Sequence, residues 1–298
     1  MEDTEHKSGF VGILGAPNVG KSTLLNRLLG EKVAITSDKP QTTRHRILGV
    51  LTRPEAQIIF MDTPGVHRAR DLLNKELVAA ALGVLPDVDL ILFLVEPGGR
   101  EEDENLLIAE LHGLKKPVIL AINKIDRMNK PELLPLLEAY RQKLPLAALV
   151  PISALKGDNL SELVGEIIAH LPPGPQYYPP ETLTDQPERF IAAEMIREQV
   201  FRRTGQEIPY STAVTVEAYK YDPQKDLTRI SAEIHVERDS QKKIVIGRKG
   251  AKLKEIGTAA RLDLERLTGG RVFLELFVRV QKKWTQDPEA LRRFGYKR

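Results

Sequence analysis

The feature that most constrains the fold is an apolar run, residues 10–15, followed at once by the sequence Gly15-Ala16-Pro17-Asn18-Val19-Gly20-Lys21-Ser22. This spacing is typical of a phosphate-binding loop (P-loop) that joins a strand to a helix. Its glycines let backbone N–H groups converge on phosphate oxygens, and the helix N-terminus adds partial positive charge. The alternative is a glycine-rich turn that binds nothing. The candidate nucleotide-contacting residues are Gly15, Asn18, Val19, Gly20, Lys21, Ser22 and Thr23.

From residue 10 to about residue 171, short apolar runs alternate with helix-like stretches. Strands separated by helices indicate an α/β fold, with a mostly parallel sheet flanked by helices on both faces. The apolar runs 47–52 and 57–62 have no helix between them, which predicts one antiparallel pair at a sheet edge. We therefore expect one domain over residues 1–172, followed by a proline-rich, semi-rigid linker over residues 173–187.

The sequence Asp62-Thr63-Pro64-Gly65 ends the third apolar run. The pattern Asp-x-x-Gly is uninformative alone, since about one match per chain arises by chance. Its position at the end of a strand beside the P-loop is informative, because a carboxylate there can hold Mg²⁺. We expect Lys21 to reach the β- and γ-phosphates, Ser22 and Asp62 to hold Mg²⁺, and the Gly65 N–H to contact the γ-phosphate.

The sequence Asn123-Lys124-Ile125-Asp126 ends the fifth apolar run and predicts which base is bound. A carboxylate can accept hydrogen bonds from both N1–H and N2–H₂ of guanine, whereas adenine offers no such pair of donors. Asp126 is therefore expected to select GTP and GDP over adenine nucleotides, which predicts a P-loop GTPase domain. After the sixth run, Ala154 is expected to donate its N–H to guanine O6. The candidate base-contacting residues are Asn123, Lys124, Asp126, Ser153, Ala154 and Leu155.

A polar segment, Pro40-Gln41-Thr42-Thr43-Arg44, lies between the first helix and the second strand. A threonine hydroxyl here can complete the Mg²⁺ shell only when a γ-phosphate is present, which would make the loop a switch. The sequence does not separate Thr42 from Thr43, and a plain solvated loop is the alternative. The candidate catalytic residues are Lys21, Thr42, Thr43 and Gly65, and the candidate metal ligands are Ser22, Thr42, Thr43 and Asp62.

Val66 follows Gly65 at the position where many small GTPases carry a glutamine that orients the attacking water. Intrinsic hydrolysis is therefore expected to be slow. Asn18 offers one remedy, because its side-chain oxygen can hold a potassium ion against the phosphates. The alternative is that Asn18 only stabilises a turn.

Beyond the linker, the order of elements changes to helix, two strands, two helices and strand, which indicates an α+β module over residues 188–298. Between its last two helices lies Gly247-Arg248-Lys249-Gly250. The pattern Gly-x-x-Gly in this setting is typical of a type II KH domain, whose loop clamps a nucleic-acid backbone. A helix–helix turn on a basic surface is the alternative. The candidate RNA-binding residues are Ile246, Gly247, Arg248, Lys249, Gly250, Lys252 and Lys254.

The charge distribution agrees with a polyanionic partner for the second module. Residues 1–180 carry 20 basic and 23 acidic side chains, a net charge of −3, whereas residues 181–298 carry 24 and 18, a net charge of +6. Trp284 near the C-terminus can stack on a base or pack internally, and internal packing is the more common role. The N-terminus is polar, and no apolar run approaches the ~20 residues that a membrane span needs. We expect a cytoplasmic, monomeric protein.

These motifs together resemble the Era family of bacterial ribosome-assembly GTPases, over nearly the whole chain. The segment Pro-Gln-Thr-Thr-Arg combined with a C-terminal KH loop is more specific than any single GTPase motif. The resemblance implies binding near the 3′ end of 16S ribosomal RNA, a role in assembly of the 30S subunit, and loose association with the inner face of the membrane. The family also shares the apolar residue that stands here as Val66.

Two other interpretations remain open on the sequence. In one, the chain is a binding protein in which GTP only gates RNA affinity and hydrolysis is incidental. In the other, the chain is a P-loop ATPase, and ATP would compete with GTP for the site.

Overall fold

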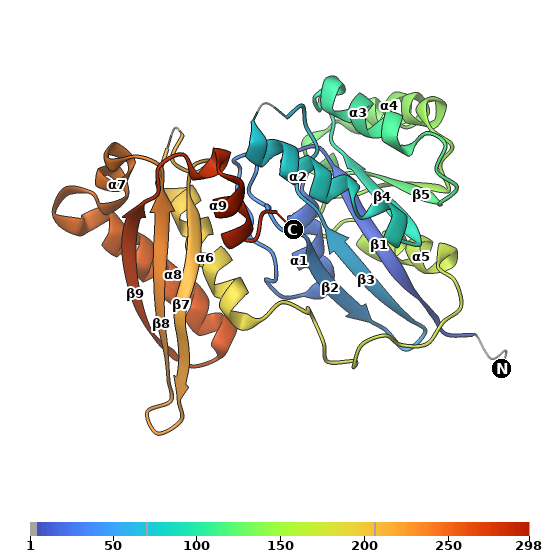
Figure 1. Ribbon diagram of the computed structural model, residues 1–298. Helices are drawn as coiled ribbons and strands as arrows, with labels where there is room; N and C mark the ends of the chain where they lie inside the picture. The colour runs from blue at the N-terminus through green and yellow to red at the C-terminus, as the bar shows by residue number, and fades with distance from the viewer. Residues whose placement is uncertain (1–4, 70, 206, 298) are drawn as a thin grey trace. The chain divides into compact units, whose positions relative to one another are not determined.

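The computed structural model describes residues 5–69, 71–205 and 207–297 (Figure 1). Their contacts divide the chain into two units. The first unit comprises residues 1–34, 43–70 and 77–185, and the second comprises residues 35–42, 71–76 and 186–298. The second unit therefore includes two short segments from the N-terminal half of the chain, which the sequence patterns did not indicate.

The first unit contains a six-stranded sheet in the order β2-β3-β1-β4-β5-β6. Neighbouring strands are parallel except β2 and β3, which confirms the predicted antiparallel edge pair. β4 and β5 are buried along their whole length, because helices cover both faces of the sheet. The strands are β1 (Lys7–Gly15), β2 (Ile47–Thr52), β3 (Ala56–Asp62), β4 (Leu90–Val95), β5 (Val118–Ile122) and β6 (Ala148–Pro151).

The helices that follow these strands are α1 (Lys21–Leu29), α2 (Leu72–Leu82), α3 (Glu101–Leu111), α4 (Lys130–Lys143) and α5 (Leu160–His170), with short 3₁₀ turns η1 (Leu85–Asp87) and η2 (Ile125–Arg127). Because β1, β3, β5 and β6 run parallel, the loops that leave their carboxyl ends meet at one edge of the sheet. That edge collects every motif that the sequence assigns to nucleotide binding.

The second unit has the predicted order of helix, two strands, two helices and strand (Figure 1). Its sheet is ordered β7-β8-β9, with β7 antiparallel and β9 parallel to β8. Apolar residues of α6, β8 and α8, among them Ile196, Ile230 and Ile256, form its core. The elements are α6 (Glu188–Arg203), β7 (Ala213–Asp222), β8 (Leu227–Val236), α7 (Asp239–Ile246), η3 (Arg248–Gly250), α8 (Ala251–Thr268), β9 (Arg271–Val280), η4 (Trp284–Gln286) and α9 (Pro288–Arg293).

The proline-rich segment is held against the first unit, where the sequence predicted a linker starting at residue 173. Ser8 N donates to Pro172 O at 3.1 Å, and Gly174 N donates to His6 O at 2.9 Å. The buried Gln57 then accepts hydrogen bonds from the backbone N–H groups of Tyr177 and Tyr178. Since prolines leave few N–H groups to satisfy, a few such bonds suffice to fix the segment along the sheet edge.

Trp284 packs internally, as its more common role suggests. Its ring is fully buried, and its Nε1 donates to Ser211 O at 2.9 Å. The rings of Phe294 and Tyr296 lie against it, with centroids 5.1 and 5.8 Å away. η4 and α9, which the sequence patterns did not predict, thus bring the C-terminal residues onto the second unit.

Among the described residues, no helix combines the length and the apolar character that crossing a bilayer requires.

His235 in β8 should make the stability of the second unit depend on pH. Burial, and the nearby guanidinium groups of Arg293 and Arg279, lower the pKa of His235 to about 4. The unfolded chain therefore binds more protons than the native chain between about pH 6.5 and 4, so stability is lost as pH falls through this range. We expect His235→Asn to reduce the loss by about 2 kcal/mol.

Urea unfolding followed by Trp284 fluorescence measures this effect in the second unit alone, since Trp284 is the only tryptophan of the chain. His112→Asn, at an exposed position of the first unit, is the control. An unchanged pH profile in the His235 variant would contradict the assignment.

Candidate functional site

The P-loop of this structure has a backbone that only its glycines permit. A Cβ atom on Gly15 would lie 2.5 Å from Leu94 O, and one on Gly20 would lie 2.3 Å from Asn123 Nδ2. Gly20 also has a φ of 103°, in the region that favours glycine. Because Gly20 has no side chain with which to cap α1, the N–H groups of the first turn, which contains Thr23, remain available to a phosphate.

Lys21 places a buried ammonium group inside this loop. Its Nζ donates to Gly15 O at 3.0 Å and to Ala16 O at 2.9 Å. Burial lowers the pKa of Lys21 to about 8, although the nearby carboxylate of Asp62 opposes this shift. A cation that only carbonyl dipoles and one carboxylate satisfy is well suited to an anionic ligand such as a phosphate chain.

Ser22, Thr43 and Asp62 form a compact oxygen cluster beside Lys21. Ser22 Oγ lies 2.7 Å from Thr43 Oγ1 and donates to Asp62 Oδ2 at 2.6 Å. Burial raises the pKa of Asp62 to about 6, against the opposing effects of the Lys21 charge and the Ser22 hydrogen bond. The other carboxylate oxygen, Asp62 Oδ1, is buried and has no hydrogen-bond partner among the described residues. Hydroxyl and carboxylate oxygens are the ligands that Mg²⁺ prefers, so the cluster fits this ion.

Thr42 points away from this cluster. Its hydroxyl donates to Lys39 O at 2.7 Å, and its carbonyl accepts a hydrogen bond from Arg197 of α6, within the second unit. Of the two threonines that the sequence left undecided, the structure brings Thr43 to Ser22 and does not bring Thr42.

The turn after β3 approaches the P-loop closely. A Cβ atom on Gly65 would lie 2.6 Å from both Pro17 N and Pro17 Cα, so only glycine fits without moving backbone. Val66 N donates to Gly15 O at 3.1 Å. The Val66 side chain is 2% exposed and packs in the hydrophobic core with Leu14 and Met61. Residue 66 therefore faces the core and not the site.

The motifs assigned to the base are joined by the buried side chain of Asn123. Its Nδ2 donates to Val19 O at 2.7 Å, and its Oδ1 accepts from Ala154 N at 2.9 Å. Ser153 Oγ donates to Asp126 Oδ1 at 2.6 Å, which holds the pKa of Asp126 below its ordinary value. Asp126 is thus a fixed, ionised acceptor.

Lys124 spans the space between two of these loops. Its Nζ donates to Asn18 O at 2.8 Å and forms an ion pair with Glu96. Glu96, at the end of β4, is a residue that the sequence motifs missed, and its position one residue after a buried strand is the signal that could have identified it. Leu155, the last of the residues that the sequence assigned to the base, is 68% exposed.

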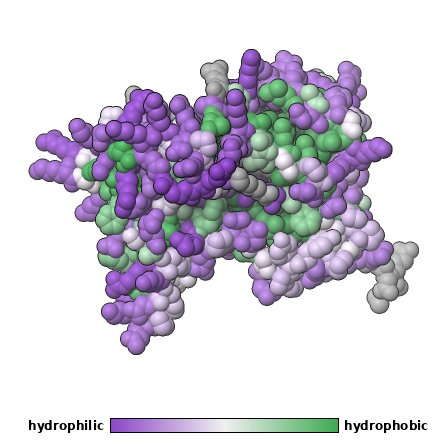
Figure 2. Space-filling view, viewed as in Figure 1, coloured by the Kyte–Doolittle hydropathy of each residue, from purple (hydrophilic) through white to green (hydrophobic). Residues whose placement is uncertain are grey.

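The Gly-x-x-Gly loop of the second unit also has a backbone that needs glycine. Gly247 has a φ of 73°, and a Cβ atom there would lie 2.6 Å from Lys252 Cβ. Ile246 before it packs partly against the core, whereas Arg248 and Lys249 are exposed. Lys252 forms an ion pair with Glu255 at 2.8 Å. The surface of this unit in the view of Figure 2 is mostly hydrophilic.

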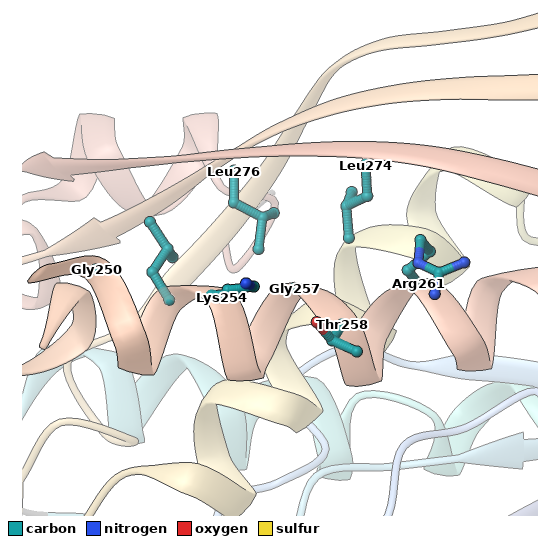
Figure 3. A pocket seen from close by; sticks show the side chains of 8 residues that line it. Gly250, Lys254, Gly257, Thr258, Arg261, Leu274 and Leu276 are labelled. Carbon is teal, nitrogen blue, oxygen red and sulfur yellow. The ribbon is translucent and has the colours of Figure 1, made fainter.

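A groove of about 400 Å³ continues from this loop between α8 and β9 (Figure 3). Of the residues that line this groove, the sequence analysis identified Gly250 and Lys254 and missed the others. The helical spacing of small and polar residues along α8 is the signal that could have found them. The groove is lined by Gly250, Leu253, Lys254, Gly257, Thr258, Arg261, Leu274 and Leu276.

Comparison with family models places two known domains on this chain. Residues 10–124 match the model described as "50S ribosome-binding GTPase". Residues 207–285 match the model described as "KH domain".

Two relatives and two solved structures match nearly the whole chain. The GTPase Era of Geobacter metallireducens is 54% identical over 99% of this chain and 100% of its own length, and that of Syntrophus aciditrophicus is 54% identical over 97% and 95%. A crystal structure of Era with MgGDPNP and nucleotides 1506–1542 of 16S ribosomal RNA aligns with a TM-score of 0.95, at 46% identity, over 98% of this chain and 100% of that one. A variant of Aquifex aeolicus Era bound to GDP·AlF4⁻ aligns with a TM-score of 0.94 and 45% identity, over the same shares.

Asp126→Asn should change the base preference of the nucleotide site. The new amide can donate to the 2-oxo group of xanthine, but it cannot accept both guanine donors. We expect GTP affinity to fall by about a hundredfold, since a site built to accept two hydrogen bonds from the base rejects a mismatch strongly, and xanthosine triphosphate affinity to rise. Competition among GTP, ATP and xanthosine triphosphate for both proteins measures this, and unchanged GTP affinity would contradict the role of Asp126.

Proposed function

We propose that this chain, which belongs to the Era family of GTPases, binds 16S ribosomal RNA through its KH domain and uses GTP binding and hydrolysis as a switch during assembly of the 30S subunit. The observation that carries the proposal is the cluster of Ser22, Thr43 and Asp62, because it can distinguish a triphosphate from a diphosphate. The solved complex of Era with 16S ribosomal RNA supports the choice of RNA.

For the nucleotide, we propose that the P-loop N–H groups and Lys21 bind the phosphates, and that Asp126 binds guanine. Asn123 and Lys124 hold the loops around the base, and the exposed Leu155 covers it. The proposal rests on the hydrogen bonds that tie these side chains to the neighbouring loops, which leave Asp126 and the P-loop N–H groups fixed in advance. Fixed acceptors and donors bind without a further cost of ordering.

For the metal, we propose that Ser22, Asp62 and Thr43 hold Mg²⁺, directly or through water. Bound Mg²⁺ would neutralise phosphate charge. The unpartnered Asp62 Oδ1 supports this role, because a buried carboxylate oxygen without a donor is unfavourable until a cation satisfies it. Thr43 is preferred over Thr42 because only its hydroxyl lies beside Ser22. Thr43 would reach the ion only when the loop of residues 40–44 lies against the P-loop, as it does here. Thr43 would therefore sense the γ-phosphate. The Gly65 N–H would contact the same phosphate.

We propose that intrinsic hydrolysis is slow because of the position of Val66. Its side chain lies in the core, so even a polar residue there would need a different backbone to reach the attacking water. Some other group must orient that water, and we propose that bound RNA favours the conformation in which it is oriented.

We further propose that K⁺ assists hydrolysis, with Asn18 as one ligand. Asn18 has a φ of 66°, which asparagine tolerates better than most residues, so a role in the turn is the alternative. Hydrolysis is expected to be several-fold faster in potassium than in sodium chloride, and Asn18→Gly, which keeps the turn, should abolish the difference. Equal wild-type rates in the two salts, measured by phosphate release, would exclude the cation role.

The proposal as a whole predicts that RNA accelerates GTP hydrolysis and that the Gly-x-x-Gly loop mediates this effect. With an RNA of nucleotides 1506–1542, we expect the single-turnover rate of the wild-type protein to rise at least about tenfold. Arg248→Asp combined with Lys249→Asp should weaken RNA binding and flatten its salt dependence, because two phosphate contacts are lost.

Lys220→Asp combined with Lys225→Asp is the matched control, since it makes the same change in charge at exposed positions of the β7–β8 hairpin. RNA binding without acceleration would favour the interpretation in which GTP only gates RNA affinity. Affinities measured with GDP and with a non-hydrolysable analogue would then quantify the gating.

The remaining parts of the proposal rest on the family alone. We propose a monomeric, cytoplasmic protein that binds the 30S subunit near the 3′ end of its RNA and associates loosely with the inner face of the membrane. The predicted domain limits, 1–172, 173–187 and 188–298, are kept as a proposal for the functional modules.

A further inference from the structure

The ion pair between Glu96 and Lys124 joins two residues that follow neighbouring strands of the first unit. β4 ends at Val95 and β5 ends at Ile122, and these two residues are partners in the parallel sheet, where the strands lie side by side (Figure 1). Asn123 N then donates to Val95 O at 2.8 Å, so the two segments stay adjacent just beyond the sheet. Both side chains of the pair therefore stand at the edge that carries the nucleotide motifs.

The backbone of Glu96 is fixed by a tight turn. Gly99 N donates to Glu96 O at 3.0 Å, and Gly98 has a φ of 68°. Proline at the second position and a glycine with positive φ at the third are the pattern of a type II turn, here starting at Glu96. A Cβ atom on Gly99 would lie 2.4 Å from Glu104 Oε1, so the turn packs closely on α3. The Glu96 side chain thus starts from a backbone that is already ordered.

Lys124 is held at both ends of its side chain. Its φ is 65°, in the left-handed region that lysine seldom adopts, and Arg127 N donates to its carbonyl oxygen at 3.0 Å. Its Nζ donates to Asn18 O at 2.8 Å and pairs with the Glu96 carboxylate. A lysine side chain is costly to order, because its four-carbon stem has many rotamers. With the backbone and Nζ both held, the apolar stem between them is ordered before any ligand binds.

The Glu96 carboxylate supplies a second acceptor for the Lys124 ammonium group. An ammonium group carries three N–H donors, of which Asn18 O accepts one. The bond to a carboxylate is stronger than the bond to a neutral carbonyl, because both partners are charged. Two acceptors from separate loops hold Nζ at one point, whereas a single acceptor lets the side chain rotate about it. Without the carboxylate, Lys124 would stay charged but lose its fixed position.

Stability of the fold does not explain a carboxylate at position 96. The buried Glu104 lies beneath the same turn, and Tyr140 Oη donates to it at 2.6 Å. Burial raises the pKa of Glu104, and the charges of Glu101 and Glu96 add to this shift against the Tyr140 hydrogen bond. The side chains of Glu96 and Lys124 are 23% and 22% exposed, and partly hydrated pairs contribute little to stability. The reason for the charge therefore lies at the nucleotide edge.

We propose that Glu96 is a positioning residue for the nucleotide, because it fixes the Lys124 stem in place to lie against one face of the guanine ring and so lengthens the residence time of GDP and GTP. The inference rests on the proposed binding of guanine by Asp126. Since both nucleotides carry the same base, the effect is equal for the two. Since the stem contacts a ring face and not its edge, the selection of guanine stays with Asp126.

The test is Glu96→Gln in the full chain, which keeps the size of the side chain and removes its charge. We expect a fluorescent GDP analogue to dissociate about fivefold faster than from the wild type, since the Lys124 stem must then be ordered in each binding event. A non-hydrolysable GTP analogue should show the same factor. The KM for GTP should rise by more than kcat changes. Stopped-flow release of the labelled nucleotides measures the rates.

Lys124→Met supplies the second measurement, because methionine keeps an unbranched apolar stem without the charge. In the Lys124→Met background Glu96 has no cation to hold, so Glu96→Gln should change the dissociation rate by less than about twofold there. Glu138→Gln is the matched control, since it removes the carboxylate of an exposed ion pair with Arg141 in α4. It should leave nucleotide dissociation unchanged.

Each other result overturns a stated claim. If Glu96→Gln accelerates release by the same factor in both backgrounds, Glu96 does not act through Lys124. If release from the variant is unchanged, the ion pair has no positioning role. If the variant lowers the unfolding temperature of the nucleotide-free protein without faster release, the pair supports the fold alone. If the wild-type protein binds no GDP, the proposed nucleotide site itself fails, which none of the other results implies.

Discussion

The nucleotide site depends on one buried amide, the side chain of Asn123. Its nitrogen donates to Val19 O in the P-loop, and its oxygen accepts Ala154 N from the loop after β6. A primary amide carries a donor and an acceptor on two separate atoms, so a carboxylate could keep only the bond from Ala154 N and an aliphatic side chain could keep neither. Gly20 must also lack a Cβ atom for the amide to fit. Loops from three separate strands are thereby held at the spacing that a bound nucleotide requires.

Sequence patterns predicted those parts of the fold that depend on neighbouring residues in the chain. Alternating apolar runs and helices predicted the parallel sheet, and the absence of a helix between residues 52 and 56 predicted the antiparallel edge. Glycine spacing predicted the P-loop and the turn of the second unit, because positive φ values and close backbone approaches demand glycine. Because parallel strands end at one edge of the sheet, the sequence also placed Asp62 at the end of β3 and Asp126 shortly after β5. Their roles in binding stay predictions.

The patterns failed where long-range contacts decide the outcome. No local sequence pattern shows which of Thr42 and Thr43 faces Ser22. The orientation of Thr42 is set by its hydrogen bonds with Lys39 O, in an irregular segment, and with Arg197, which is distant in the sequence. The position of the proline-rich segment is fixed by Gln57, which is 120 residues away from Tyr177 in the sequence. The positions of η4 and α9 are fixed by the buried Trp284. The sequence also missed Thr258, Arg261 and Leu274, which line the groove between α8 and β9. Which sides of α8 and β9 face each other is set by tertiary packing.

The bonds between residues 6–8 and 172–174 close the first unit on itself, since its first strand is held by its last residues. Such contacts, with a sequence separation near that of the whole unit, are the slowest kind to form in folding. On a translating ribosome, β1 would be made first yet could not gain these partners until residue 174 had emerged. The first unit is therefore expected to complete its fold only late in synthesis. Because residues 6–8 lie beside residues 172–174, these two ends could also be joined in a circularly permuted chain.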